Sequence, residues 1–368
     1  MNKNLLKIFL VWLGLLLAVG FVAIHFSTYK VGHCEVKNQL PYYRWDSFWY
    51  TSISQHGYNF SDSKNSSIAF FPLYPMVIRA VHFVSHWKEN KISFGLNILF
   101  AFLATLYLYR LAKLDYDEKK SLAVVAVFLF FPPAYFFLAG YPDGLFALVA
   151  IVSFYFARKK NWALAGIAAG LLALTKPYGI LIFPALGLEY LWTHNWDLKI
   201  VFKKFDWLPL LLPIFSFGGF VLFNYLMFHN PIAFLEAQQT WGRKLVNPLA
   251  ALLEEGRHYL LGGHILTGSN FPYVIYLGSF LFSIWAFGVA WNRVRKTYLL
   301  FSFLLLLSAF LTGTLTSWGR YMLLGFPVLM GPAVYFIEKK KMFWLYLLTS
   351  AVLLLVCANF FVRCFPFE

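Results

Sequence analysis

One carboxylate in the N-terminal part of the chain has neighbours that could tune it for proton transfer. Asp46 lies in the segment YRWDSFWY, with Arg44 and Trp45 before it and Trp49 after it. Desolvation by aromatic side chains raises the pKa of a carboxyl group and a nearby cation lowers it, which is how enzymes adjust a general base. The alternative is an aromatic belt at a membrane surface, in which Asp46 caps a short helix or pairs with Arg44.

Two cations later in the chain are of a kind that binds phosphate. Lys176, in TKPYG, falls between two apolar stretches, where a lysine is costly unless it meets an anion. Arg320, in SWGRY, opens an apolar stretch, where its charge adds to the positive end of a helix dipole. The alternative for both is contact with lipid headgroups. Asp143, in YPDG, either caps the following helix or forms a second acidic site.

Metal and nucleotide chemistry has little support in the sequence. His82 and His86 are four residues apart, as zinc ligands can be, but neither the glutamate of HExxH nor a further ligand accompanies them. Cys34, Cys357 and Cys364 form no CxxC pair and no even-numbered disulfide framework. A glycine-rich phosphate loop is also absent from the sequence. We therefore expect no metal, no other cofactor and no disulfide scaffold.

The composition is that of a membrane protein. Of the 368 residues, 60% are hydrophobic and only 13% are charged, whereas soluble domains have about 25% charged residues. The formal net charge of +15 could indicate nucleic-acid binding, but the basic residues stand in short clusters between apolar stretches, like cytoplasmic anchors. We expect one integral-membrane domain over residues 1–368, in contact with the lipid bilayer and with no nucleic acid.

Apolar stretches that could cross a membrane recur along the whole chain. About eleven crossings are predicted, near residues 5–26, 92–110, 121–139, 143–157, 162–175, 178–193, 207–228, 271–291, 298–316, 320–337 and 343–362. A cytoplasmic N-terminus places 18 of the 31 lysine and arginine residues in short cytoplasmic loops, as the positive-inside rule favours. This predicts an all-α, multi-pass protein whose first apolar stretch is retained, although one miscounted helix would invert part of the map.

Two long segments fall on the non-cytoplasmic side in this topology, at about 27–91 and 229–270. Within the first, the stretch 70–87 is apolar but carries Pro72, Pro75 and Arg79, so we expect it to lie in the membrane interface with Arg79 and His82 on its wet side. The mixed stretch from Pro231 to about residue 261 suits a second interfacial helix. Chemistry is therefore expected on the outer face.

Four segments together carry a resemblance to a known family: RWDSFWYTSISQHGY, AFFPLYP, NPIAFLEAQQTWGR and SWGRYMLLGFP. In this order they resemble the membrane mannosyltransferases that add the second mannose in glycosylphosphatidylinositol anchor synthesis, and most closely the shorter bacterial relatives of those enzymes. The resemblance covers nearly the whole chain. It implies a GT-C-like helical bundle in a bacterial cell membrane and a glycosyltransferase that uses a polyprenyl-phosphate sugar.

The resemblance also implies roles for individual residues. Asp46 falls on the acidic residue of the first outer loop that such enzymes use as catalytic base. Donor-phosphate binding is implied for Arg320, Lys176 and Arg243. Substrate binding is implied for Arg44, Trp45, His56, Tyr58, Asp143, Gln239, Trp241 and Tyr321. Two motifs depart from the family pattern, because YPDG replaces a hydroxyl residue followed by glutamate and serine, and KPYG replaces an arginine motif with asparagine.

These residues predict a mechanism in which Asp46 removes the proton of an acceptor hydroxyl while outer cations stabilise the leaving phosphate. The sugar is expected to be a hexose such as mannose, transferred with inversion to a glycan, glycolipid or protein acceptor. One alternative is a transporter or flippase of lipid-linked sugars, which would normally show repeated halves and ionisable residues at the bilayer midplane. Another is a non-catalytic membrane partner subunit, which has no need of Asp46 beside outer cations.

Overall fold

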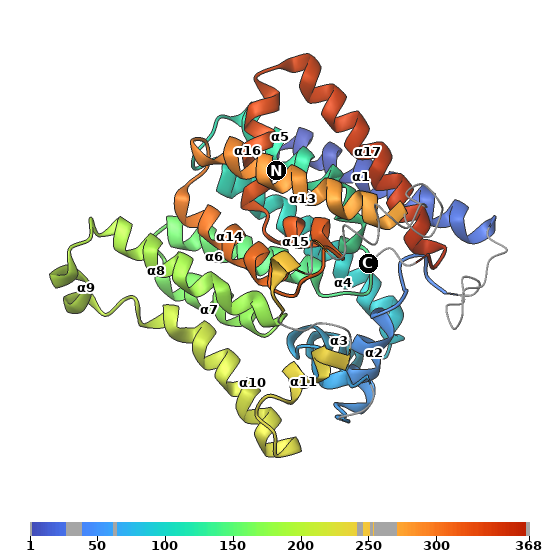
Figure 1. Cartoon of the computed structure of the whole chain (residues 1–368), viewed down its shortest axis with the longest axis horizontal. Coiled ribbons are helices and arrows are strands. Elements are labelled where there is room, and N and C mark those ends of the chain that lie inside the picture. Colours follow the sequence, from blue (N-terminus) through green and yellow to red (C-terminus); the bar gives the residue numbers. More distant parts are fainter. Residues whose placement is uncertain are drawn as a thin grey trace. The chain divides into compact units, whose positions relative to one another are not determined.

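The computed structural model describes residues 2–26, 39–61, 65–240, 246–250, 253 and 271–365. Every regular element in these ranges is a helix, which confirms the predicted all-α fold for the described part of the chain (Figure 1). Contacts divide the chain into two compact units. Unit 1 comprises Met1–Tyr42, Tyr116–Tyr135 and Arg243–Glu368, and unit 2 comprises Tyr43–Asp115 and Phe136–Gly242.

Unit 1 is built from helices of both ends of the chain. Its helices are α1 (Lys3–His25), α5 (Glu118–Phe130), α13 (Phe271–Trp291), α14 (Lys296–Phe310), α15 (Trp318–Leu324), α16 (Pro327–Ile337) and α17 (Lys340–Val362). Helix α1 packs on α17 and α5, while α16 contacts α5, α13 and α14. Asp117 is the N-cap of α5, where its side chain accepts a hydrogen bond from the backbone N–H of Lys120 at 2.8 Å.

Unit 2 holds the middle of the chain. Its helices are α2 (Ser47–His56), α3 (Leu73–Ser85), α4 (Glu89–Ala112), α6 (Asp143–Arg158), α7 (Trp162–Ala173), α8 (Ile182–Thr193), α9 (Leu198–Lys204), α10 (Leu212–Phe228) and α11 (Ala233–Thr240), with 3-10 turns η1 (Ser67–Ala69), η3 (Pro177–Leu181) and η4 (Leu208–Leu211). A further 3-10 turn, η2 (Pro132–Phe137), contains residues of both units. Helix α6 packs between α4 and α7, and α2 lies beside α3 (Figure 1).

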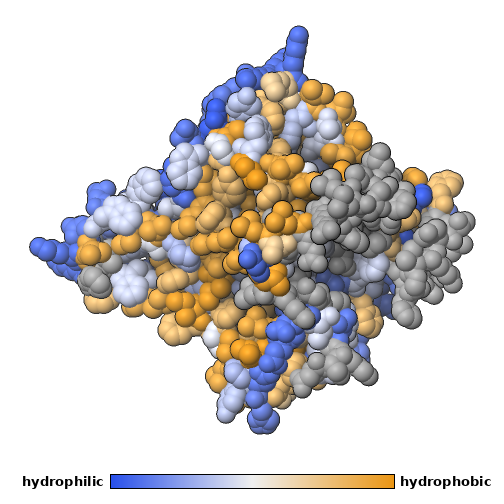
Figure 2. All heavy atoms as spheres, in the orientation of Figure 1, coloured by the Kyte–Doolittle hydropathy of each residue, from blue (hydrophilic) through white to orange (hydrophobic). Residues whose placement is uncertain are grey.

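Among the residues that the structure describes, five helices are long and apolar enough to cross a membrane: Lys3–His25, Glu89–Ala112, Leu208–Phe228, Val274–Trp291 and Lys340–Val362. The bent pair Trp318–Leu324 and Pro327–Ile337 makes a sixth if it is one span. These helices support a multi-pass membrane protein, but they do not confirm eleven crossings. Hydrophobic side chains cover much of the visible surface, whereas hydrophilic ones gather at the tip formed by α9 and at the upper and lower ends of the view (Figure 2).

Proline explains why several predicted crossings are shorter than expected. Helix α5 ends at Phe130, just before Pro132 and Pro133, and the stretch predicted at 178–193 begins with the 3-10 turn at Pro177. The stretch predicted at 320–337 is broken before Pro327, where α15 and α16 bend by 86°. Proline lacks the backbone N–H that would continue a helix, so these stretches divide into shorter helices.

The predicted helix at 70–87 is present as α3. Met76, Phe83 and Val84 lie exposed on it, and such an apolar face suits a helix lying in the membrane interface. Arg79 lies on the same exposed face, because it follows Met76 by three residues and precedes Phe83 by four. The preceding FFP motif anchors α3, since Phe70 stacks on Trp49 with ring centroids 5.7 Å apart.

One prediction about the cysteines is wrong. Cys364, just after α17, is buried and disulfide-bonded, whereas Cys357 is a free buried thiol. Disulfides persist in oxidising compartments. Spacing along the sequence could not find this disulfide, because the pairing of distant cysteines depends on how the chain folds.

Candidate active site

Asp46 lies on a tight turn that directly precedes α2. The backbone of Trp45 has φ of 47°, in the left-handed region that bulky residues rarely adopt. The indole N–H of Trp45 is buried and has no hydrogen-bond partner among the described residues. Strained backbone and unsatisfied buried polar groups of this kind persist mostly at functional sites.

The carboxylate of Asp46 does not cap α2. Although Asp46 holds the N-cap position, its side chain accepts no capping hydrogen bond from the first turn of the helix. The side chain is partly exposed. The purely structural interpretation of Asp46 as a helix cap is therefore not what the structure shows.

Arg44 is held rigidly beside this turn. Its side chain is only 2% exposed, and its Nη1 donates to the backbone carbonyl of Tyr43 at 2.7 Å. The backbone N–H groups of Arg44 and Ser47 donate to the Ser47 Oγ and the Arg44 carbonyl, respectively. Burial lowers the pKa of Arg44 to about 10, so the guanidinium is still charged at neutral pH. A fixed cation therefore lies two residues before the candidate base.

A second turn, residues 139–141, supports the start of α2. The hydroxyl of Tyr141 accepts a hydrogen bond from the backbone N–H of Asp46 at 3.2 Å. A Cβ on Gly140 would come within 2.7 Å of the Ser47 Oγ, so only glycine permits this close approach. The buried side chain of Asn97 in α4 donates to the carbonyls of Ala139 and Tyr141 and holds the turn in place.

Asp143 and Lys176 form a buried ion pair. Their Oδ2 and Nζ atoms are 3.2 Å apart, and the exposed fractions of the side chains are 0% and 8%. The Lys176 ammonium also lies 5.8 Å from the ring centroid of Tyr178. The anion that Lys176 was expected to need is thus the carboxylate of Asp143. Asp143 lies two residues after Tyr141, whose hydroxyl binds the backbone N–H of Asp46.

His56 and Tyr58 lie at the other end of α2 from Asp46. A ten-residue helix is about 15 Å long, so these two side chains are not neighbours of the candidate base. The Tyr58 hydroxyl donates to the carbonyl of Phe70 at 2.9 Å, and burial raises its pKa. Both residues line a cavity between α2, α3 and α10 instead.

The later predicted residues fall in different parts of the chain. Gln239 is exposed on α11, whereas Trp241 and Arg243 lie outside the described residues. The predicted interfacial helix from Pro231 to about residue 261 is seen only as α11, and its remainder lies outside the described residues except for the short stretches 246–250 and 253.

Arg320 and Tyr321 belong to unit 1, at the start of α15. Both side chains are partly exposed. Ser317 precedes the helix with φ of 64°, and the Trp318 indole N–H donates to the Ser283 hydroxyl at 3.1 Å. A Cβ on Gly319 would come within 2.8 Å of Pro133, so the SWGR motif is a tightly packed turn.

Three residues of this region were not predicted from the sequence. Tyr141 lies two residues before the predicted Asp143. Its hydroxyl accepts a hydrogen bond from the backbone N–H of Asp46, 95 residues away in the sequence. Asn97 and Gly140 support the same turn. A fully buried asparagine in an apolar helix is the one signal that could have indicated the site, since polar residues within membrane helices are usually functional. No group of three His, Cys, Asp or Glu residues in the described ranges could hold a metal ion.

Residues 34–167 match the sequence profile of the mannosyltransferase (PIG-V) family. The match confirms the resemblance to these mannosyltransferases. It covers Asp46, Arg44 and Asp143, whereas Lys176, Gln239 and Arg320 lie beyond it.

Solved structures similar to this chain come from the oligosaccharyltransferase of Archaeoglobus fulgidus. One, a complex with zinc and sulfate, has a TM-score of 0.47 and 12% identity and covers 94% of this chain and 53% of its own. Another, with an inhibitory peptide and a dolichol-phosphate, has a TM-score of 0.45 and 11% identity and covers 96% of this chain and 55% of its own. The chain spans about half the length of these structures. No curated protein matches the sequence.

Proposed function

We propose that this protein transfers a hexose, mannose in the first instance, from a polyprenyl-phosphate donor to an acceptor hydroxyl on the non-cytoplasmic face of a membrane. The observation that carries the proposal is Asp46 itself. Its carboxylate does not cap α2, its turn is strained at Trp45, and both residues lie within the mannosyltransferase match. A partly exposed carboxylate without a capping role is suited to accept a proton.

The proposed reaction is a single displacement with inversion. The acceptor oxygen forms a bond to the anomeric carbon as Asp46 takes its proton, and the bond from that carbon to the phosphate oxygen breaks. The electron pair leaves with the polyprenyl phosphate. Fixed cations stabilise the charge that develops on this phosphate.

The cations divide into two roles in this proposal. Arg320 and Arg243 bind the donor phosphate, while Lys176 pairs with the buried carboxylate of Asp143. Arg44, Trp45 and Gln239 contact the sugars, together with Trp241 and Tyr321. The scheme uses no metal ion and no other cofactor.

The outer location of the reaction is also part of the proposal. The basic clusters favour a cytoplasmic N-terminus, which places Asp46 outside. The disulfide at Cys364 is in agreement with this orientation, because the end of α17 would then also face an oxidising compartment. A bacterial cell membrane meets these conditions.

A direct assay tests the proposed function. Purified protein in detergent is given polyprenyl-phosphate mannose and a panel of glycan, glycolipid and peptide acceptors, and free polyprenyl phosphate is measured. Release that depends on an acceptor and persists in EDTA would support the proposal. Transport of the donor across a vesicle membrane without release would identify a flippase instead.

A further inference from the structure

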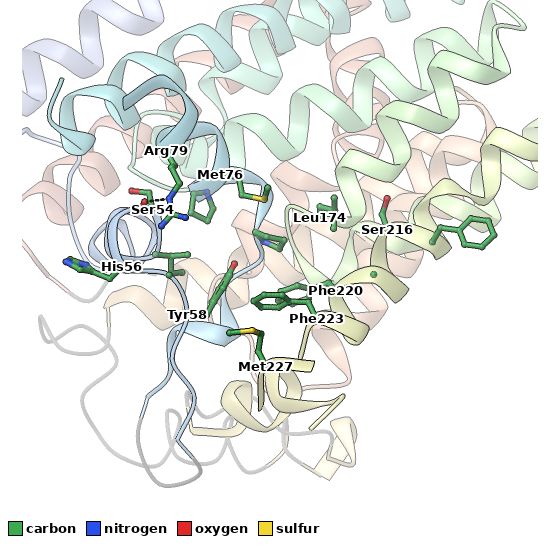
Figure 3. A pocket seen from close by; sticks show the side chains of 16 residues that line it. Ser54, His56, Tyr58, Met76, Arg79, Leu174, Ser216, Phe220, Phe223 and Met227 are labelled. Atoms are coloured by element: carbon green, nitrogen blue, oxygen red, sulfur yellow. Dashed lines mark hydrogen bonds between the residues drawn. The ribbon is translucent and has the colours of Figure 1, made fainter. Parts of the chain in front are cut away.

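A cavity of about 750 Å³ lies within unit 2, between the C-terminal end of α2, helix α3 and helix α10 (Figure 3). This volume is in the range of about 300–1,000 Å³ that ligand pockets usually have. Most of its wall is aromatic or aliphatic, with Tyr58, Phe220, Phe223 and Met227 among the lining residues. The walls are therefore suited to a hydrocarbon chain.

The cavity opens where the protein would meet lipid. Helix α10 belongs to one of the five candidate spans, and α3 carries the exposed apolar face described above. Phe215, Met227 and Met76 line the cavity and are nevertheless 68%, 59% and 63% exposed. A molecule in the bilayer could therefore enter from the side, without passing through water.

One end of the cavity carries positive charge. The Nε of Arg79 donates to the Ser54 carbonyl at 2.6 Å (Figure 3). Its Nη2 donates to the Gln55 carbonyl at 3.3 Å. An arginine has five N–H donors, so the other three have no partner among the described residues. The exposed His56 lies at the same end, and none of the described residues that line the cavity is acidic.

An anion bound by Arg79 cannot be the leaving phosphate of the proposed reaction, and this step rests on the proposed function. Arg79 donates to the carbonyls of Ser54 and Gln55 near the end of α2, whereas Asp46 precedes its first residue, so about 12–14 Å of helix separates them. In a direct displacement the base and the leaving phosphate lie on opposite sides of one anomeric carbon, a much shorter distance. The cavity therefore fits a lipid other than the donor.

We propose that this cavity is a binding site for one anionic phospholipid of the bilayer. The phosphate lies on the free N–H groups of Arg79, and one acyl chain follows the wall of Tyr58, Phe223 and Met227. The lipid joins α2, α3 and α10, so its binding stabilises the helix that directly follows Asp46.

The test uses the full chain, purified in detergent and stripped of lipid. Thermal unfolding is followed after addition of phosphatidylglycerol, of phosphatidylcholine with the same acyl chains, of polyprenyl phosphate, or of inorganic phosphate. We expect phosphatidylglycerol to raise the unfolding midpoint most, with an affinity on the order of tenfold above phosphatidylcholine, as one or two charge-assisted hydrogen bonds provide.

Two glycines of α10 supply a matched pair of variants. A Cβ on Gly219 or on Gly218 meets nothing within 4 Å, but only Gly219 lines the cavity. Gly219→Trp should fill the cavity and abolish the phosphatidylglycerol effect, and Gly218→Trp should retain it. Arg79→Gln keeps a donor for the α2 carbonyls but should lose the preference for the anionic lipid.

Several results would overturn the proposal. These are equal shifts with the two phospholipids, a phosphatidylglycerol effect that survives in Gly219→Trp, or an equal shift with inorganic phosphate alone. A larger shift with polyprenyl phosphate than with phosphatidylglycerol would assign the cavity to the donor instead. Each lipid effect is measured without turnover, so a failure of the proposed activity would not affect the outcome.

Discussion

The backbone N–H of Asp46 donates a hydrogen bond to the hydroxyl of Tyr141, 95 residues further along the chain, at 3.2 Å. This contact joins the two sequence motifs that carry acidic residues, YRWD and YPDG. Because Gly140 approaches Ser47 so closely, the turn before α6 packs directly against the start of α2. The position of the candidate base therefore depends on the turn that precedes α6, far along the chain from α2.

The first prediction concerns Asp46 as general base. Asp46→Asn keeps the volume of the side chain but cannot accept a proton, so turnover should fall by about 10²–10⁴-fold. Donor binding and the unfolding temperature should hardly change, because the carboxylate neither binds phosphate in the proposed scheme nor caps α2. Steady-state kinetics and donor titration measure the two effects. A folded variant with normal turnover would contradict the mechanism.

Tyr141 should act on turnover only through the position of Asp46. Tyr141→Phe removes the hydroxyl but keeps the ring packed against Phe136, 5.5 Å between centroids. The loss of about 1 kcal/mol for one hydrogen bond predicts a drop in kcat of about fivefold with KM unchanged. Tyr116→Phe, which removes a hydroxyl that donates to the Arg293 carbonyl in unit 1, is the matched control and should leave kcat as it is.

The Asp143–Lys176 pair should behave as a coupled unit. Asp143→Asn or Lys176→Met leaves the other charge buried alone, which should cost about 3–5 kcal/mol of stability. The double variant should be more stable than either single variant, as measured by a double-mutant cycle of unfolding. Lys120→Met breaks the exposed pair with Glu338 and should have almost no effect. If Lys176→Met unfolds normally but no longer binds the donor, Lys176 is a phosphate ligand, as the sequence first indicated.

Arg320 should affect both binding and catalysis. If it holds the donor phosphate before and during bond cleavage, Arg320→Ala should raise KM and lower kcat together. Arg320→Lys keeps the charge but loses the planar, two-pronged hydrogen bonding of arginine, so it should recover only part of the loss. A rise in KM with unchanged kcat would mean that Arg320 binds the ground state and the transition state equally well. It would then not stabilise the leaving group.

Labelling of introduced cysteines tests the topology. Cysteines near Asp62 and at Asn247 should react with an impermeant thiol reagent added from outside, whereas one at Lys159 should react only after the membrane is permeabilised. Mass spectrometry of the labelled protein measures each reaction. The reverse pattern would place Asp46 in the cytoplasm and exclude the proposed outer active site.

The sequence alone determined the class of protein, the helical fold and the region of the candidate site. Composition and the length of apolar stretches decide these features, because a chain with so few charges can satisfy its backbone in lipid only by forming helices or closed barrels. The family resemblance of the YRWD and FFP motifs could be read locally as well. These motifs are short, and their residues act within one turn or helix.

The tertiary structure alone decided which of these residues meet. Asp143, at the start of α6, pairs with Lys176, which lies between α7 and η3. Arg79 donates to carbonyls at the end of α2 instead of facing only the wet side of α3. The disulfide at Cys364 also differs from the predictions, and the eleven predicted crossings are not confirmed. Periodicity and hydropathy describe each helix by itself. Which helices pack together, and which buried charges then neutralise each other, depends on contacts between segments far apart in the chain.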